Sequence, residues 1–348
     1  MLHAFTRRTS ISCGMQQGTE HLYQAAAEAL RQAKRAVITT HMNPDGDAIG
    51  SVCALRNYLL ERGVAARVLL PTPAPENLLW IAGAEDLEVF DAERHPEVIA
   101  SADTMVVLDV NVVKRFAPVD VKLASQEATI IGIDHHVQPE AFARIQCTDT
   151  VAPATCSMLV DLLGLIDPIQ PLSPAVAEPL YTGIMTDTGN FRFPRTTSDT
   201  HRKIAALIDA GADPAKCYEL TFNQSSVGRM NMLGEALCSM RTFHDGRFCV
   251  MVITSHDLQR HGCTSDDVEG FVHHTLGIAG VRAGVMIVEL DGVIKLSFRS
   301  KGDTYVRDLA ATYGGGGHLA AAGARVYGRS LDDVVIDVIA NAQKLFRS

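Results

Sequence analysis

The sequence predicts an α/β protein with an N-terminal domain built on a doubly wound parallel sheet, a linker helix, and a smaller C-terminal α/β domain with a mixed sheet. Short β-branched and aliphatic runs alternate with amphipathic helical segments over residues 36–210, which is typical of a parallel sheet covered by helices. A helical, polar-flanked stretch follows. Beyond it, Asp291-Gly292 separates two apolar runs and is the strongest hairpin signal in the chain.

In the N-terminal domain, the expected strands are short and strongly apolar. They are predicted at residues 36–40, 64–70, 104–110 and 128–133. The expected helices cover residues 20–34, 48–62, 97–100, 153–163 and 197–210, with a further helix opened by Ser173-Pro174. A proline in the first turn suits a helix because its fixed φ is already helical and its missing N–H would be unpaired there anyway.

The C-terminal domain is expected to begin near residue 246. Its predicted strands cover residues 248–254, 282–290 and 293–299, and its predicted helices cover residues 266–276, 306–313 and 331–346. Residues 217–240 are predicted to be helical, and residues 223–226 (NQSS) are their loosest stretch. We therefore divide the chain into a disordered extension (1–18), a first domain (19–215), a helical linker (216–244) and a second domain (245–348).

Acidic and histidine side chains follow the apolar segments of the first domain. In chain order they are His41, Asp45, Asp47, Asp109, Asp134, His135, His136 and Asp187. Ligands of open α/β sheets bind outside the carboxyl ends of the strands, so we expect these side chains to meet at one edge of the sheet. For the first loop alone an alternative is open, in which Asp45 is a turn residue and Asp47 caps the following helix.

Four of the five aspartates in this set would bring four negative charges to one place: Asp45, Asp47, Asp109 and Asp187. They could not all stay ionised without compensation. Two divalent cations would neutralise them and leave His41 and His135 as neutral ligands. A pair of ions about 3.5–4 Å apart suits phosphoryl transfer. The absence of cysteine from the set favours Mn²⁺, with Mg²⁺ as the alternative, over a structural zinc.

The order of these motifs resembles a known family. The segments HMNPDGDAIGS from His41 and TDTGNF from Thr186, the lone Asp109 and the triplet Asp134-His135-His136 resemble the four motifs of the DHH phosphoesterase superfamily. The segments SFRS (297–300) and GGGGHLAAAG (314–323) resemble the DHHA1 domain of one branch. The resemblance runs from about residue 20 to the C-terminus. One departure is that residues 137–139 read VQP, where the family often has an asparagine.

The resemblance also implies a role for each residue. One ion would be held by His41, Asp45 and Asp109. The other would be held by Asp47, Asp109, His135 and Asp187, so that Asp109 bridges the two and is part of the catalytic set. His136 would face the substrate, either as general acid or by stabilising the phosphate, and Asp134 would orient a histidine.

In the second domain, the resemblance implies a substrate-binding site. Gly315, Gly316 and Gly317 could turn their N–H groups into an anion-binding concavity, and a helix starting near His318 would add its dipole. Arg299 could contact a phosphate in two places. The alternatives are a flexible glycine loop and a surface arginine in an ion pair. Phe191 and Phe193 follow Asp187 closely; such residues usually belong to the core, although one could stack on a base.

The function implied is a two-metal phosphodiesterase that hydrolyses oligoribonucleotides of about two to five nucleotides to 5′-mononucleotides, a range taken from the resemblance, with 3′-phosphoadenosine 5′-phosphate (PAP) phosphatase activity as a second reaction. Within the enzyme class, the main alternative is a cyclic-di-AMP or linear dinucleotide phosphodiesterase. A family II pyrophosphatase is disfavoured because its lysine- and arginine-rich C-terminal motif is not found. An inactive nucleotide sensor is disfavoured because every ligand position is filled.

Composition limits the partners. The net charge of −9, from 40 acidic and 31 basic residues, argues against a broad basic face for long duplex nucleic acid. The 8 scattered cysteines form no CxxC pair, which is typical of a reduced, cytoplasmic protein. No apolar run approaches the length of a membrane span. The expected partners are therefore short RNA or dinucleotides, and a homodimer is compatible with the sequence.

Residues 1–18 loosely resemble a transit peptide, but we favour a disordered extension.

Overall fold

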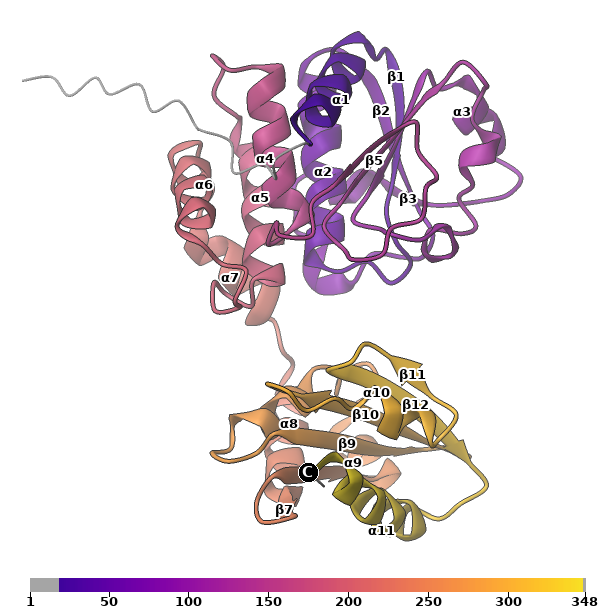
Figure 1. Cartoon of the computed structure of the whole chain (residues 1–348), viewed down its shortest axis with the longest axis vertical. Helices are drawn as coiled ribbons and strands as arrows, with labels where there is room; N and C mark the ends of the chain where they lie inside the picture. Colours follow the sequence, from indigo (N-terminus) through magenta and orange to yellow (C-terminus); the bar gives the residue numbers. More distant parts are fainter. Residues whose placement is uncertain (1–18, 347–348) are drawn as a thin grey trace, which may run out of the picture. The chain divides into compact units, whose positions relative to one another are not determined.

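The computed structural model describes residues 19–346, and the chain forms two compact units that divide between Gln224 and Ser225 (Figure 1). The expected extension at residues 1–18 lies outside the described residues. The division falls in the stretch that the sequence marks as the loosest part of the linker. Instead of one continuous linker helix, α7 (Pro214–Phe222) ends in the first unit and α8 (Val227–Ser239) begins in the second.

The first unit contains an entirely parallel six-stranded sheet with the order β3-β2-β1-β4-β5-β6. Its strands are β1 (Arg35–Thr39), β2 (Ala65–Leu70), β3 (Leu87–Val89), β4 (Thr104–Leu108), β5 (Thr129–Asp134) and β6 (Ile145–Thr148). The strand order reverses between β1 and β4, so the topological switch point lies at the carboxyl ends of these central strands. The predicted doubly wound parallel sheet is confirmed.

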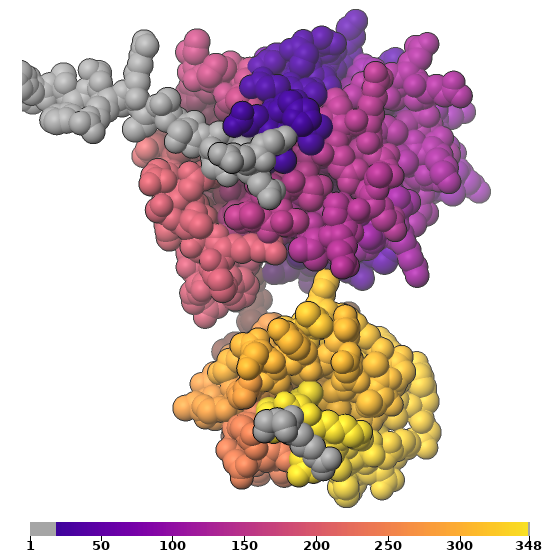
Figure 2. Space-filling model, in the orientation of Figure 1, coloured from indigo at the N-terminus to yellow at the C-terminus, as the bar shows by residue number. Residues whose placement is uncertain are grey.

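Both faces of this sheet are buried. Neighbouring residues of a strand point to opposite faces, so each strand contributes side chains to two cores. Ile38 of β1 packs into the larger core, whereas Val37 packs into a second core on the other face. The helices that contribute to the larger core are α1 (Glu20–Gln32), α2 (Gly46–Glu61), α4 (Thr155–Ile166), α5 (Pro174–Asp187), α6 (Ser198–Asp209) and α7. The second core is covered by α3 (Pro96–Ser101) and irregular segments. The outer side of α1 lies at the surface of the unit (Figure 2).

Glycines allow three of these helices to approach one another closely. A Cβ on Gly50 of α2 would lie 2.5 Å from the carbonyl oxygen of Pro179 in α5. A Cβ on Gly183 of α5 would lie 2.2 Å from Sγ of Cys156 in α4 and 2.9 Å from Oδ1 of Asp47 in α2. Real side chains do not tolerate such distances, so these glycines bring the ends of α2, α4 and α5 together beside the switch point.

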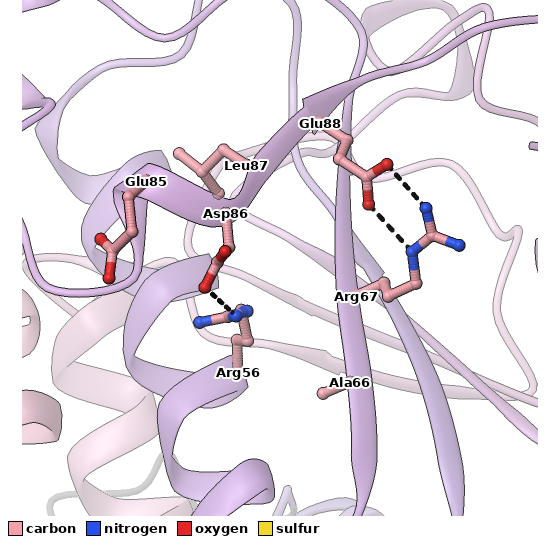
Figure 3. A pocket seen from close by; sticks show the side chains of 7 residues that line it. All are labelled: Arg56, Ala66, Arg67, Glu85, Asp86, Leu87 and Glu88. Atoms are coloured by element: carbon pink, nitrogen blue, oxygen red, sulfur yellow. Dashed lines mark hydrogen bonds and ion pairs between the residues drawn. The ribbon is translucent and has the colours of Figure 1, made fainter.

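A groove of about 370 Å³ lies where α2 meets the β2–β3 edge of the sheet (Figure 3). Its two arginines are paired. Arg56 contacts Asp86, and Arg67 holds Glu88 through two hydrogen bonds of 2.9 and 2.6 Å. Bidentate pairs of this kind fix geometry, so we interpret the charges here as anchors for the short edge strand β3.

The second unit contains a mixed six-stranded sheet with the order β11-β12-β10-β9-β8-β7, in which only β8 and β9 pair in parallel. Its strands are β7 (Arg241–Phe243), β8 (Phe248–Ile253), β9 (Ala283–Leu290), β10 (Val293–Ser300), β11 (Gly316–Gly317) and β12 (Ala321–Tyr327). Its helices are α8, α9 (Ser255–His261), α10 (Arg307–Ala311) and α11 (Leu331–Ala342). The mixed sheet is as predicted. The predicted hairpin joins β9 to β10, with Gly292 at a φ of +71°.

One predicted helix of this unit is wrong. Residues 266–276 form turns followed by a 3₁₀ helix at Phe271–Gly277. Gly270 interrupts the segment with a φ of +87°, a left-handed conformation that an α-helix cannot contain. Within residues 19–346, no helix has both the length and the apolar character needed to cross a bilayer.

Candidate metal centre and active site

His41 leaves the carboxyl end of β1 and points its Nε2 atom into the first unit's carboxylate cluster. The side chain is buried. Its Nδ1 lies 2.9 Å from the carbonyl oxygen of Met42, so in the neutral ring Nδ1–H donates to that carbonyl and Nε2 keeps its lone pair. Nε2 has no hydrogen-bond partner but lies 3.4 Å from Oδ2 of Asp109 and 3.9 Å from Oδ1 of Asp45. A buried lone pair aimed at two carboxylates fits a cation ligand.

Asp45 and Asp47 lie at the start of helix α2, but their roles differ from the alternative considered for the sequence, in which Asp47 caps the helix. The N-cap is Asp45, whose Oδ1 accepts the N–H groups of Asp47 and Ala48, each at 3.1 Å. Asp47 lies in the first turn and is buried. Its two oxygens accept the N–H groups of Thr155 (2.6 Å) and Cys156 (2.9 Å) at the start of α4. The positive end of α4 therefore stabilises the Asp47 carboxylate.

Asp109 lies at the centre of the cluster, one residue after β4. Its φ of +59° is left-handed, a conformation that costs free energy for a residue with a Cβ and that concentrates at functional sites. The side chain is buried, and Oδ1 accepts the Thr155 hydroxyl at 3.0 Å. The same oxygen lies 3.5 Å from Nε2 of His135. Asp109 thus faces imidazoles from both β1 and β5.

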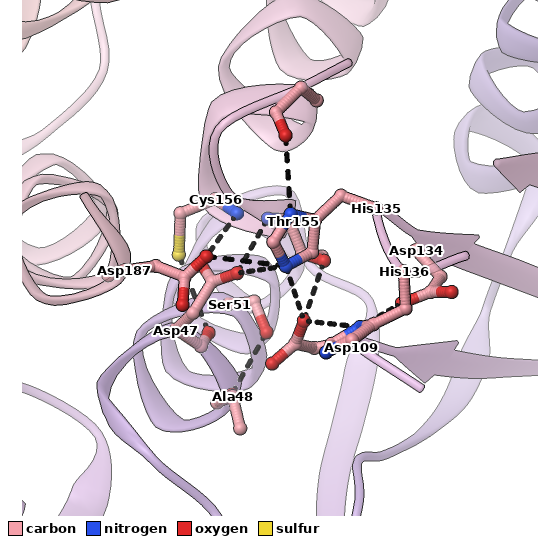
Figure 4. A network of polar contacts seen from close by, with 12 residues as sticks. Asp47, Ala48, Ser51, Asp109, Asp134, His135, His136, Thr155, Cys156 and Asp187 are labelled. Carbon is pink, nitrogen blue, oxygen red and sulfur yellow. Dashed lines mark hydrogen bonds and ion pairs between the residues drawn. The ribbon is translucent and has the colours of Figure 1, made fainter. Parts of the chain in front are cut away.

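The two histidines that follow β5 point toward different carboxylates (Figure 4). Nε2 of His135 lies 3.4, 3.5 and 3.8 Å from oxygens of Asp187, Asp109 and Asp47. Nδ1 of His136 donates to Oδ1 of Asp134 at 2.7 Å. The His135 side chain is only 6% exposed, whereas that of His136 is 27% exposed. His136 is therefore oriented by Asp134 and keeps its Nε2 for another partner.

Burial and mutual repulsion shape the acid–base chemistry of the cluster. Burial, followed by the charge of neighbouring carboxylates, raises the pKa of Asp109 well above its usual value. Burial is also the main cause that raises the pKa of Asp47 to about 6 and that of Asp187 to about 7. Burial lowers the pKa of His41 and His135, so both imidazoles are neutral near pH 7. A bound cation would oppose the carboxylate shifts because it favours the ionised forms.

The arrangement fits divalent cations. Three groups of side chains each place their ligand atoms within 4.8 Å of one another: His41 with Asp45 and Asp109, Asp47 with His135 and Asp187, and Asp109 with His135 and His136. The first two groups match the ligand sets that the resemblance implies for two separate ions, except that the second group lacks Asp109. Asp109 nevertheless lies close to both His41 and His135. Asp187 joins them from the C-terminal end of helix α5, not from a strand.

The sequence did not predict the contribution of α4. Pro153 marked the start of a helix, but nothing in the pattern indicated that the N–H groups of Thr155 and Cys156 would meet Asp47. Cys156 is buried, and its Sγ donates to the Asp47 carbonyl oxygen. Burial raises the pKa of that thiol well above its usual value, so the metal-free protein keeps it protonated near pH 7.

In the second unit, Arg299 and the glycine-rich segment lie at neighbouring positions. Arg299 pairs with Ala321 across β10 and β12, and the N–H of His318 donates to the Ala321 carbonyl at 2.8 Å. Burial lowers the pKa of Arg299 from its usual value. The usual pKa of a guanidinium is so far above neutral pH that the side chain stays charged.

The glycine run differs from the expected concavity. Gly316 and Gly317 form strand β11 on the sheet edge, and no helix starts at His318. The N–H of Gly315 donates to the Ala310 carbonyl. A Cβ on Gly315 would lie 2.1 Å from the carbonyl oxygen of Gly323. Close packing against β12 is therefore the physical reason for this glycine.

Comparison with known proteins identifies the family of this chain. Residues 35–184 match the DHH family, N-terminal domain, and residues 245–345 match the DHHA1 domain. The chain belongs to the DHH phosphoesterase family, in the branch that carries a DHHA1 domain. The resemblance seen in the sequence is thus confirmed.

Individual relatives agree with this assignment. The chain is 32% identical over 310 residues to the bifunctional oligoribonuclease and PAP phosphatase of Thermus thermophilus, covering 88% of this chain and 89% of the relative. Identity to the Bacillus subtilis protein of the same name is 30%, over 84% and 89% of the two chains. Among solved structures, an exopolyphosphatase-related protein from Bacteroides fragilis has a TM-score of 0.87 at 30% identity, covering 94% of this chain and 98% of the other.

Proposed function

We propose that the protein is a divalent-metal-dependent phosphodiesterase that hydrolyses short oligoribonucleotides to 5′-mononucleotides. The observation that carries this proposal is the cluster in which two sets of oxygen and nitrogen ligands lie around the buried Asp109. The two relatives named above are oligoribonucleases and PAP phosphatases, and PAP phosphatase activity is the second reaction we propose for this chain.

Two bound cations would activate a water molecule and stabilise the charge on the phosphoryl oxygens. The chain's own residues prepare the site for that chemistry. The amide groups that open α4 hold Asp47 in place, and Thr155 orients Asp109. His136, held through Nδ1 by Asp134, would donate a proton from Nε2 to the leaving oxygen when the ring is in its protonated, imidazolium form.

We propose Mn²⁺ as the native ion, with Mg²⁺ as the alternative. The proposed ligands are carboxylate oxygens and imidazole nitrogens: His41, Asp45, Asp47, Asp109, His135 and Asp187. Such mixed ligands suit Mn²⁺ better than the all-oxygen environment that Mg²⁺ prefers. In the second unit, we propose that Arg299, Gly315–Gly317 and His318 contribute to substrate binding.

A turnover panel tests the proposal. The substrates are pApA, a 20-nucleotide RNA, cyclic-di-AMP and PAP, each with Mn²⁺ or Mg²⁺, and product formation is followed by chromatography. We expect pApA to be hydrolysed to AMP faster than the long RNA, and PAP to lose one phosphate. Faster turnover of cyclic-di-AMP than of pApA would favour the alternative phosphodiesterase. Failure to hydrolyse any substrate with either ion would refute the proposal.

A further inference from the structure

A pocket of about 350 Å³ opens beside the carboxylate cluster, wholly within the first unit. It is lined by Pro153, Asp187, Thr188, Phe193, Pro194 and Arg195. Two prolines and a phenylalanine supply apolar surface, and one arginine supplies positive charge. A site for one small ligand is typically concave and mostly apolar, with a few fixed polar groups. This pocket has that character, and it shares Asp187 with the proposed metal centre.

The loop after α5 holds Phe193 in a defined position. The carbonyl oxygen of Thr188 accepts the N–H of Phe193 at 3.0 Å. The turn passes through Gly189, whose φ is +56°. A Cβ there would lie 2.5 Å from the Phe193 ring, so the ring packs directly on the glycine. The Phe193 residue is nevertheless 51% exposed, whereas Phe191 packs against the core. One side of the Phe193 ring is thus supported and another is open to a ligand.

Arg195 has a donor that the metal-binding form of the site cannot satisfy. Its Nη1 lies 3.3 Å from Nδ1 of His135, and that Nδ1 also lies 3.2 Å from the Ala152 carbonyl oxygen. If His135 Nε2 binds a cation, the ring proton must lie on Nδ1 and donate to Ala152. Nδ1 can then accept nothing from Arg195, because two donors would face each other. The exposed guanidinium is then available to bind an anionic oxygen.

From this geometry we propose that the pocket binds one nucleotide of the substrate, with the Arg195 guanidinium on its phosphate and the Phe193 ring stacked on its base. The proposal rests on the proposed function and assigns a nucleotide subsite to it. Stacking on an aromatic ring tolerates any base, so the pocket would recognise a nucleotide without reading its sequence. Arg195 would complement the cations, because it contacts phosphate oxygens from the pocket side.

Equilibrium binding tests the subsite without relying on turnover. The Mn²⁺-loaded full-length protein is titrated calorimetrically with AMP and with ribose 5-phosphate, which keeps the phosphate and lacks the base. We expect the wild type to bind AMP at least about 5-fold more tightly, as base stacking predicts. Phe193→Ala and Phe193→Leu should remove that preference and leave ribose 5-phosphate binding unchanged. Arg195→Ala should weaken both ligands by about 10-fold or more.

Arg202→Ala is the matched charge control, since this arginine of α6 has a side chain that is 72% exposed. It should change neither affinity. The subsite is refuted if the wild type binds AMP no better than ribose 5-phosphate, if Phe193→Leu keeps the preference, or if Arg195→Ala binds both ligands like the wild type. If these affinities change as expected but pApA is not hydrolysed, the subsite stands and the proposed function fails.

Discussion

Asp109 combines a left-handed backbone, a buried carboxylate and contacts to imidazoles from two strands. If it bridges two cations, Asp109→Asn removes one negative charge from both at once. We expect kcat for pApA to fall by at least about two orders of magnitude, as for loss of a main electrostatic contribution. The amide has nearly the same shape and can still accept the Thr155 hydroxyl, so the circular dichroism spectrum should not change. Activity within a few-fold of the wild type would contradict the bridging role.

The two histidines of the triplet should separate in a metal titration. His135→Ala removes an imidazole that faces three carboxylates, so metal affinity should fall and excess Mn²⁺ should restore part of the rate. His136→Ala removes an imidazole that is more exposed and is held by Asp134. It should lower kcat with little change in metal affinity. Equal loss of bound Mn²⁺ in both variants, measured by calorimetry, would show that this division of roles is wrong.

The raised pKa values of Asp47 (about 6) and Asp187 (about 7) predict how pH affects the metal-free protein. Both values exceed those of the unfolded chain, so the folded state binds protons more tightly. Their contribution to the free energy of unfolding is complete below about pH 4 and is lost as pH rises through 6 and 7. In EDTA, Tm should fall between pH 5 and pH 8. Excess Mn²⁺ should reverse the trend, because cations bind the ionised carboxylates. An unchanged slope in Asp187→Asn would contradict the assignment.

At the scale of elements, glycine packing makes the geometry of α2, α4 and α5 testable. In Gly183→Ala, the new Cβ would lie 2.2 Å from Sγ of Cys156 and 2.9 Å from the Asp47 carboxylate. We expect a loss of roughly 1–3 kcal/mol in the free energy of unfolding together with weaker metal binding. Gly164→Ala is the matched control in α4, since no atom lies within 4 Å of its added Cβ. It should stabilise the helix by about 0.5–1 kcal/mol. Similar effects of the two substitutions on denaturant unfolding would disprove the steric argument.

The elements that the sequence predicted well are those whose pattern is local. Residues 36–40 and 48–62 correspond to β1 and α2 because an apolar run and a proline–glycine turn mark them. The short edge strands β3 and β11 were not predicted, since three and two residues carry no periodicity and depend on pairing with β2 and β12. The strand conformation of the glycine run was not predicted for the same reason. A contact with a distant strand, and not the local sequence, determines its backbone.

Prediction of the candidate site from the sequence has the same limit: local patterns can be recognised, and contacts between distant residues cannot. The site's histidines and aspartates were recognisable because they follow apolar segments. The parallel sheet explains why most of them converge, whereas Asp187 reaches the site from the end of helix α5. The amides that open α4 were not recognisable, because an N–H group has no sequence signature. The contact of Arg195 with His135 joins residues that are 60 positions apart. Side-chain contacts over such separations depend on how α5 and the loop after it pack, which one sequence does not reveal.

For the whole molecule, the last prediction concerns substrate length. A protein with a net charge of −9 is not expected to have a broad basic surface for a long RNA. We therefore expect the affinity for RNA to come from a few individual contacts. We propose Arg299 of the second unit as one of them. Arg299→Ala should raise KM for pApA by about one to two orders of magnitude with little change in kcat, because a charge-assisted contact is lost equally from ground and transition states.

The control for this variant is Arg325→Ala, since Arg325 is an exposed arginine of β12 in the same unit. It should leave KM unchanged. If Arg299 binds one end of a short substrate, the preference for pApA over a 20-nucleotide RNA should also shrink in Arg299→Ala and persist in Arg325→Ala. If Arg299→Ala kept both the wild-type KM and the wild-type length preference, the second unit would not determine substrate length through this arginine. Selection would then have to lie within the first unit, where the Arg195 pocket is the candidate.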